Sequence, residues 1–195
     1  SCLVADYPFS GNANDVSGNG NNAVVYGATI TEDRFGSVNS AYLFDGIDDF
    51  IDTESSFHFN FGTISIWAQV NQLGQPMRIV EMDAQSLTYG AVGITVNANG
   101  SLTVNAGGSA QVLSNTVNTG EWNHYVLVRN GNQGSFYLNG QLVANLNTSG
   151  NGSSTNPNPD LLIGTWRTED DRFFNGKIDD IKIFDCVLSP QEIQE

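Results

Sequence analysis

The chain has 195 residues, which is enough for one domain with a sizeable hydrophobic core. Its 7 basic residues stand against 21 acidic ones, and this net charge of −14 argues against nucleic acid or an anionic membrane surface as a partner. No apolar run approaches the roughly 20 residues of a membrane helix, so we expect no membrane insertion. We expect a single domain over residues 1–195, with a charge that suits calcium binding, a saline exterior or solubility alone.

Short apolar runs separated by turn residues make up the first half of the chain. Residues 3–9 (LVADYPF) predict a first strand, with Pro8 at an edge or a strand end. Residues 10–22 (SGNANDVSGNGNN) predict an irregular loop because Gly and Asn dominate them. Residues 71–90 carry charges and are interpreted as a second irregular segment. Further short strands are predicted at residues 24–26, 41–44, 48–51 and 63–70.

The second half of the chain predicts hairpins. Asn-Gly and related turn residues at 97–100, 130–134 and 139–140 each separate two runs that are typical of strands. Residues 147–159 predict a long loop, and 161–164 return to a strand. Only residues 189–193 (SPQEI) predict a helical turn, with Ser as the N-cap. This pattern predicts an all-β fold, an antiparallel two-sheet β-sandwich of jelly-roll type with one short C-terminal helical turn.

The stretch from Gly176 to Ser189 (GKIDDIKIFDCVLS) predicts a buried strand that contains a carboxylate. With a period of two residues, Asp179 shares a face with Ile181 and Ile183. An unpaired buried carboxylate would cost several kcal/mol. Asp179 therefore needs a cation, a cluster of donors or an exposed strand end.

Two cysteines, Cys2 and Cys186, lie near opposite ends of the chain. If the first and last strands pair in antiparallel fashion, the register that pairs Tyr7 with Ile181 also pairs Cys2 with Cys186. A disulfide between them is then geometrically possible and would imply an oxidising compartment. Two free thiols, or a Cys2 that is lipidated in a precursor, are the alternatives.

Several segments in order along the chain resemble laminin-G-like jelly-roll domains of the concanavalin A-like lectin/glucanase superfamily. They are residues 3–22, 40–51 (SAYLFDGIDDFI), 121–124 (EWNH), 136–140 (FYLNG) and 176–189. The resemblance implies the sandwich fold. It also implies an adhesive or carbohydrate-binding module attached to a larger secreted protein, and a structural calcium ion in many members.

Calcium is the expected cofactor. The loop at residues 12–22 offers Asp15, amide side chains and glycines that let carbonyls turn inward, all of which are oxygen ligands that Ca²⁺ takes. Adjacent first and last strands would bring Asp179 to the same end, and the resemblance implies the same pair. Asn21 and the carbonyl of Gly18 would complete the shell. The alternative is that Asp15 only forms a turn and Asp179 only accepts backbone N–H bonds.

Catalysis is not expected, although the superfamily includes retaining glycosidases with two carboxylates in an E-x-D-x-E or E-x-D-x-x-E motif. Glu81 and Asp83 begin like that motif, but Gln85 and Ser86 stand where the second Glu should be. An amide or a hydroxyl cannot protonate a leaving group. His124 matches a framework position of the family, and we expect a structural role for it.

Sugar binding is expected in the loop at residues 165–174 (TWRTEDDRFF). Lectin sites combine an aromatic face with fork-shaped donors and carboxylates. This loop gathers an aromatic ring and charged groups, and the irregular segment at 71–90 could face it. Trp67 and Trp122 are expected to hold structure instead. The predicted ligand-binding residues are Trp166, Arg167, Asp170, Arg172, Arg78 and Tyr89. The alternative is an ordinary loop with solvated ion pairs.

The sequence thus predicts a non-catalytic, lectin-like module of a larger secreted or cell-surface protein, stabilised by calcium, with a glycan ligand and neighbouring domains as partners. A structural or protein-binding adhesion module without a glycan ligand is the alternative, and a glycosidase is a distant third.

Overall fold

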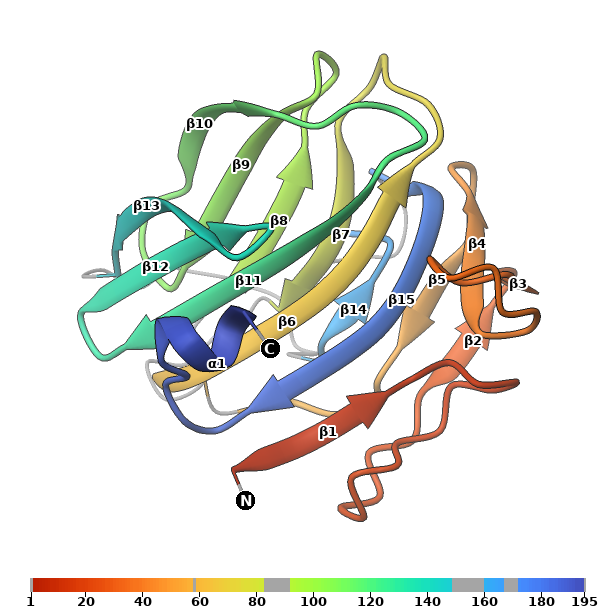
Figure 1. The fold of residues 1–195 in the computed structure, drawn as a ribbon, viewed down its shortest axis with the longest axis horizontal. Coiled ribbons are helices and arrows are strands. Elements are labelled where there is room, and N and C mark those ends of the chain that lie inside the picture. The colour runs from red at the N-terminus through yellow and green to blue at the C-terminus, as the bar shows by residue number, and fades with distance from the viewer. Residues whose placement is uncertain (1, 58, 83–91, 149–159, 167–171, 195) are drawn as a thin grey trace.

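Two antiparallel β-sheets stack face to face in the computed structural model of the chain (Figure 1). The structure describes residues 2–57, 59–82, 92–148, 160–166 and 172–194. Side chains from both sheets form one continuous hydrophobic core between them, which includes Tyr7, Ile64, Ile94 and Phe136. The predicted all-β sandwich is confirmed. Among the described residues, no helix has the length and apolar character needed to cross a bilayer.

The eight-stranded sheet contains both ends of the chain. Its strands in spatial order are β13 (Gln141–Asn147), β12 (Gln133–Leu138), β11 (Trp122–Asn130), β6 (Phe61–Val70), β15 (Asn175–Phe184), β4 (Ala41–Asp45) and β3 (Thr29–Thr31), and β1 (Leu3–Tyr7) pairs with β15. Along β6, Ile64, Ile66 and Ala68 alternate into the core, as the sequence pattern predicts. Ser65 and Trp67 therefore project from the opposite, outer face.

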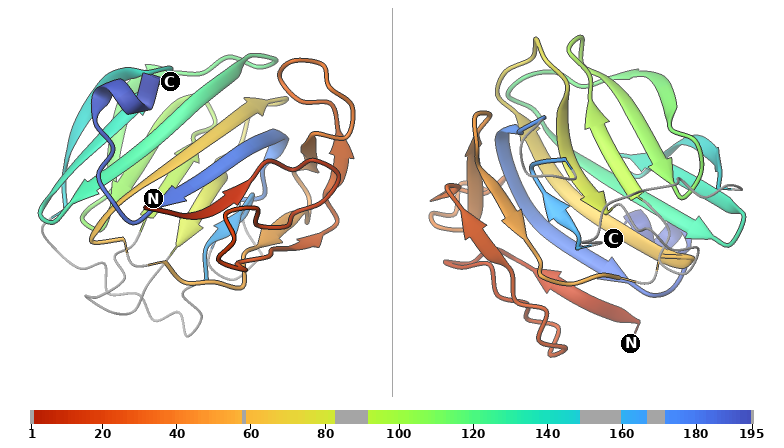
Figure 2. Two further views of the ribbon diagram at one scale, coloured as in Figure 1. Left: turned by 60° about the horizontal axis from the view of Figure 1, so that its bottom comes forward. Right: turned by 180° about the vertical axis from the view of Figure 1, so that it is seen from behind.

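The seven-stranded sheet lies behind the first, as the view from behind shows (Figure 2). Its strands in spatial order are β10 (Gln111–Thr116), β9 (Ser101–Ala106), β8 (Val92–Val96), β7 (Met77–Met82), β14 (Leu162–Ile163), β5 (Phe50–Asp52) and β2 (Val24–Tyr26). The sequence analysis did not predict strands β3 and β10.

Strand β7 corrects the interpretation of residues 71–90 as irregular. Every residue of Met77–Met82 is buried, and the strand occupies the middle of the seven-stranded sheet. The sequence does not predict this strand because Arg78 and Glu81 interrupt an otherwise apolar run. Their side chains form an ion pair with each other, with 3.0 Å between Nε and Oε2, which allows both to be buried in a strand.

The two ends of the chain meet in the predicted register from Ala5 to Tyr7, and an irregularity between Leu3 and Ala5 shifts the pairing by one residue. Tyr7 pairs with Ile181, and Ala5 pairs with Ile183, on antiparallel strands β1 and β15. Just beyond these strands, Cys2 and Cys186 form a disulfide with 5.8 Å between their Cα atoms. The predicted cross-link between the first and last strands is therefore present in the structure.

The short helix α1 (Pro190–Gln194) begins with the predicted cap. The Ser189 backbone N–H donates to the Glu192 carboxylate at 2.7 Å, and the Glu192 N–H donates to the Ser189 hydroxyl at 3.3 Å. Ile193 then packs on Val126 and Tyr137. This contact holds α1 against the outer face of the eight-stranded sheet (Figure 1).

Candidate functional site

A row of residues crosses five strands of the seven-stranded sheet on the face that points away from the core. Strand pairing aligns Asp52, Leu162, Glu81, Gly93 and Asn105 on β5, β14, β7, β8 and β9 in that order. Their neighbours along each strand lie in the core; these are Ile51, Ile163, Val80, Ile94 and Val104. Since side chains alternate along a strand, the five aligned residues share the outer face. We call this set, together with Arg78, the polar row.

Three polar side chains of the polar row converge at Gly93. A Cβ atom at this position would lie 2.5 Å from Oδ1 of Asn105, 2.6 Å from Nη1 of Arg78 and 2.8 Å from Oε2 of Glu81. Only glycine leaves room for this approach. A carboxylate, a guanidinium fork and an amide, which include both donors and acceptors, thus meet on one patch of backbone, where Arg78 and Glu81 are buried and Asn105 is half-buried.

Arg172 connects the Trp166 ring to strand β7. The backbone carbonyl of Arg172 accepts a hydrogen bond of 2.8 Å from the Arg78 N–H. The Arg172 guanidinium carbon lies 4.2 Å from the centre of the Trp166 ring, within the range of a cation–π contact. Arg172 has a φ of 57°, in the left-handed region. Trp166, Arg172 and Arg78, three of the predicted ligand residues, are therefore linked by direct contacts.

The other three predicted ligand residues, Arg167, Asp170 and Tyr89, lie outside the described residues. The polar row also contains groups that the sequence interpretation did not assign to a ligand. Asn105 and Asp52 reach it only through strand pairing between distant segments. No local sequence signal marks them.

The carboxylate of Asp15, a predicted calcium ligand, accepts hydrogen bonds from its own loop and from β1. Its carboxylate accepts the backbone N–H groups of Asp6, Ser17 and Asn21 and the Ser17 hydroxyl, at 2.8–3.0 Å. Burial alone would raise the pKa of Asp15, but these four hydrogen bonds outweigh it and leave the pKa below its usual value. Each carboxylate oxygen therefore accepts two hydrogen bonds, and the four donors occupy the lone-pair sites that a cation would need.

The other predicted calcium ligands have separate partners. The Asn21 amide nitrogen donates to the Val4 carbonyl at 2.8 Å, and its Oδ1 accepts from Ser55 at 3.1 Å. Gly18 lies in the exposed part of the loop.

Arg34 is the cation that pairs with Asp179. Nη1 of Arg34 lies 2.6 Å from Asp179, and Nη2 lies 2.7 Å from Asp180. Burial, followed by the neighbouring Asp180, raises the pKa of Asp179 to about 6 in spite of Arg34. Of the three alternatives predicted for Asp179, a cation, a cluster of donors or an exposed strand end, the structure has the cation, which is Arg34 and is not shared with Asp15. As arranged, these residues do not fit a calcium ion.

A match to a known family model identifies the superfamily to which this chain belongs. The family model of the concanavalin A-like lectin/glucanases superfamily matches residues 45–194. This chain belongs to that superfamily. Comparison with curated protein sequences finds no match.

Several solved structures have the same fold as this concanavalin A-like chain. Domain 4 of AbnA, a GH43 extracellular arabinanase from Geobacillus stearothermophilus in complex with arabinotriose, has a TM-score of 0.74 and 19% identity, covering 98% of this chain and 96% of that domain. Trypanosoma rangeli sialidase with 2,3-difluorosialic acid has a TM-score of 0.74 and 17% identity. That match covers 99% of this chain but only 32% of the sialidase chain, and at these identities both comparisons show the fold alone.

The superfamily includes glucanases, so the surroundings of Glu81 matter. Its carboxylate forms an ion pair with the Arg78 guanidinium, with 3.0 Å between Oε2 and Nε. The positions where a second glutamate is expected, Gln85 and Ser86, lie outside the described residues. This lectin/glucanase-type sandwich therefore presents on β7 one carboxylate in an ion pair and no carboxylate pair among the residues that the structure describes there.

Proposed function

We propose that this chain is a non-catalytic, glycan-binding module of a larger secreted or cell-surface protein, and that the polar row with Trp166 forms its binding face. The convergence of Arg78, Glu81 and Asn105 at Gly93 carries the proposal. Neighbouring hydroxyls of a sugar need a donor and an acceptor a short distance apart, and this patch offers both.

Trp166 would supply the apolar part of the site. An aromatic face packs on the C–H face of a sugar ring, while fixed polar groups select the orientation of the hydroxyls. Trp166 is half-buried and its cation–π contact with Arg172 helps to hold the ring in place. A rigid ring loses little conformational entropy when a ligand binds.

Two further observations support an extracellular location and a carbohydrate ligand. The disulfide between Cys2 and Cys186 is typical of an oxidising, extracellular environment. The fold is shared with a domain of an extracellular arabinanase whose structure contains arabinotriose. Arabinotriose is therefore a reasonable first probe. Neighbouring domains of a parent protein are the expected partners.

Titration calorimetry with arabinotriose and a panel of other neutral oligosaccharides tests this function. We expect Trp166→Ala to reduce affinity at least tenfold with an unchanged melting temperature. Glu81→Gln should also weaken binding, because a neutral amide no longer pairs with Arg78 or accepts two hydroxyls. Tyr26→Ala, on the same sheet but outside the polar row, serves as a control with unchanged affinity.

A turnover assay on the same oligosaccharides separates the proposed module from a glycosidase. Hydrolysis by the wild type that disappears in Glu81→Gln would contradict the non-catalytic assignment. A structural or protein-binding module is the alternative. It predicts no oligosaccharide binding and a Trp166→Ala variant that is destabilised.

A further inference from the structure

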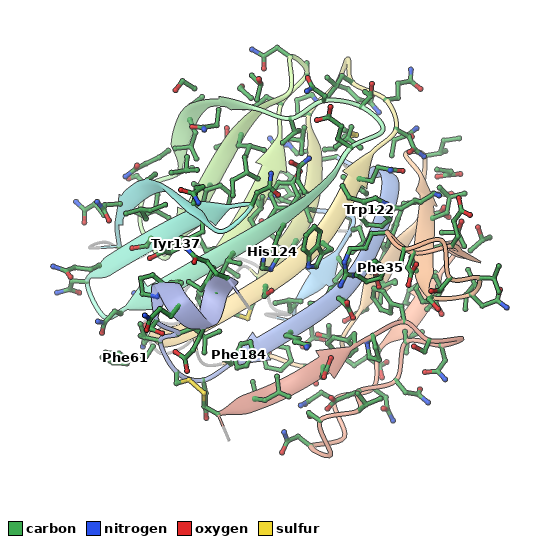
Figure 3. All side chains as sticks on the ribbon, in the orientation of Figure 1. Phe35, Phe61, Trp122, His124, Tyr137 and Phe184 are labelled. Carbon is green, nitrogen blue, oxygen red and sulfur yellow. A yellow bond between two sulfur atoms is a disulfide. The ribbon has the colours of Figure 1, made fainter. Side chains whose placement is uncertain are left out.

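A separate groove of about 210 Å³ lies on the opposite side of the molecule, on the outer face of the eight-stranded sheet. Its floor is formed by β6, β11 and β15, and its sides by α1 and the loop that carries Arg34. His124 and Phe184 lie on the same side of the sheet as α1 (Figure 3). We call this the α1 groove. It shares no residue with the polar row.

Three stacked groups form one wall of the α1 groove. The Trp67 and His124 rings are nearly parallel, with 4.8 Å between their centres and 8° between their planes. The guanidinium carbon of Arg34 lies 4.6 Å from the centre of the Trp67 ring. Because Arg34 is also held by two carboxylates, the stack is fixed in position before any ligand arrives.

Polar groups of both kinds face the same space. Ser65 Oγ and His124 Nε2 are 2.7 Å apart, so one donates to the other and the pair keeps a further donor or acceptor for a ligand. The Lys182 ammonium makes no ion pair in the part of the chain that the structure describes. Burial, with help from Arg34, lowers the pKa of His124 to about 4, so its ring is neutral at pH 7.

The opposite side of the α1 groove is apolar. Phe184, Leu188, Val126 and Ile193 line it, and the last three also take part in the contact between α1 and the sheet. The groove therefore sets an apolar surface opposite hydroxyl, imidazole and ammonium groups. That combination is typical of sites for small ligands that carry both C–H faces and hydroxyls.

We propose that the α1 groove binds one ring of a neutral sugar, with Lys182 and Ser65 contacting its hydroxyls and Phe184 packing against its C–H face. This site is additional to the glycan-binding face at the polar row. Two sites on opposite sheets would let one module hold two glycan chains, or two parts of one chain.

Charge and size define the ligand. The charged residues that line the α1 groove balance, with Arg34 and Lys182 against Asp180 and Glu192, so the groove offers no net charge to attract a carboxylated or sulfated sugar. A cationic ligand is disfavoured because Arg34 already covers one face of Trp67 and the other face is covered by His124. The volume is below the usual 300–1,000 Å³ of sites for larger ligands, which limits the occupant to about one ring.

The three tryptophan indole N–H signals in a ¹⁵N NMR spectrum test this proposal on the whole chain. Single Trp→Phe variants assign them, so that Trp67 reports on the α1 groove and Trp166 on the polar row. Arabinose, galactose, glucose, xylose and arabinotriose are titrated at millimolar concentrations. We expect at least one of them to shift the Trp67 signal with saturation. A shift of Trp166 alone would overturn the second site while leaving the proposed function in place.

Matched lysine variants on β15 complete the test. Lys182→Ala should weaken the response of the Trp67 signal at least fivefold, whereas Lys177→Ala, on the same strand but outside the groove, should leave it unchanged. Equal responses in the two variants, or no saturable Trp67 shift with any neutral sugar, would overturn the proposal. So would tighter binding of glucuronate than of glucose.

Discussion

Arg34 and Asp179 are 145 residues apart in the chain and 2.6 Å apart in space. Asp179 is only 2% exposed, and Arg34 lies over the Trp67 ring while its second nitrogen binds Asp180. One guanidinium therefore neutralises the carboxylates at the bulge of β15 and covers an aromatic ring of β6. It attaches the loop after β3 to the centre of the eight-stranded sheet.

Removing this cation should destabilise the fold strongly. In Arg34→Met, Asp179 would remain buried without a partner, so we expect a loss of about 3–5 kcal/mol in the free energy of unfolding. Adding Asp179→Asn to this variant should recover part of that loss. Lys177→Ala, which removes an exposed pair with Glu32, should cost less than about 1 kcal/mol. Chemical denaturation of the four proteins measures these differences, and an Arg34→Met loss equal to that of Lys177→Ala would contradict the account.

Calcium should have little effect on stability if the predicted ligand set is arranged as the structure shows. Asp15 accepts four hydrogen bonds, and Asp179 is paired with Arg34. The melting temperature should therefore be the same in calcium and in EDTA. A saturable rise in melting temperature with calcium that is lost in Asp15→Asn would restore the ion to the place that the family resemblance implies.

The disulfide should be a major source of stability. It joins residues 184 positions apart, so in the chain-entropy account its reduction frees a very long loop in the unfolded state, at a cost of about 5 kcal/mol. The double variant Cys2→Ser/Cys186→Ser should unfold at a clearly lower denaturant concentration than the wild type. Adding a reductant should move the wild type to the same midpoint and leave the double variant unaffected. Equal midpoints for the two oxidised proteins would be inconsistent with this role.

His124 should make the fold sensitive to acid. Its pKa is about 4 in the folded chain and about 6.5 when unfolded, so its contribution to stability is complete above pH 6.5 and is lost as the pH falls through 4. The shift corresponds to about 3 kcal/mol. His124→Gln should lack this loss, which stability measurements between pH 7 and 4 would show.

Asp179 acts in the opposite direction over part of the same range. Its pKa of about 6 exceeds the unfolded value of 3.8, so its contribution is complete below 3.8 and is lost as the pH rises through 6. Asp179→Asn therefore serves as the control for His124→Gln. Its stability should fall more steeply with acid than that of the wild type. Identical profiles for wild type and His124→Gln would exclude His124 as the acid-sensitive group.

The sequence was informative where local pattern and covalent chemistry decide the structure. Alternation along Thr63–Val70 predicted the core face of β6, and the pairing of Tyr7 with Ile181 predicted both the register and the disulfide. It also predicted that a buried Asp179 needs a cation, a cluster of donors or an exposed strand end. Those inferences depend on periodicity and on the cost of burying charge, both of which can be read from a single strand.

Contacts between distant segments could not be predicted in the same way. Arg34 lies in a loop with no pattern that directs it to Asp179, and the sequence instead predicts a calcium ion bound by Asp179 and Asp15. Strand β7 was missed because Arg78 and Glu81 look like surface charges until their ion pair is seen. Asn105 joins the polar row only through the register of β8 and β9.

A glycan-array screen of the wild type and Trp166→Ala, run in calcium and again in EDTA with melting temperatures recorded, tests the central claim most directly. We predict binding of the wild type to neutral glycans in both buffers. Trp166→Ala should lose that binding while keeping its melting temperature. No glycan bound by the wild type in either buffer, with a protein that melts cooperatively, would contradict glycan recognition and favour a structural or protein-binding module.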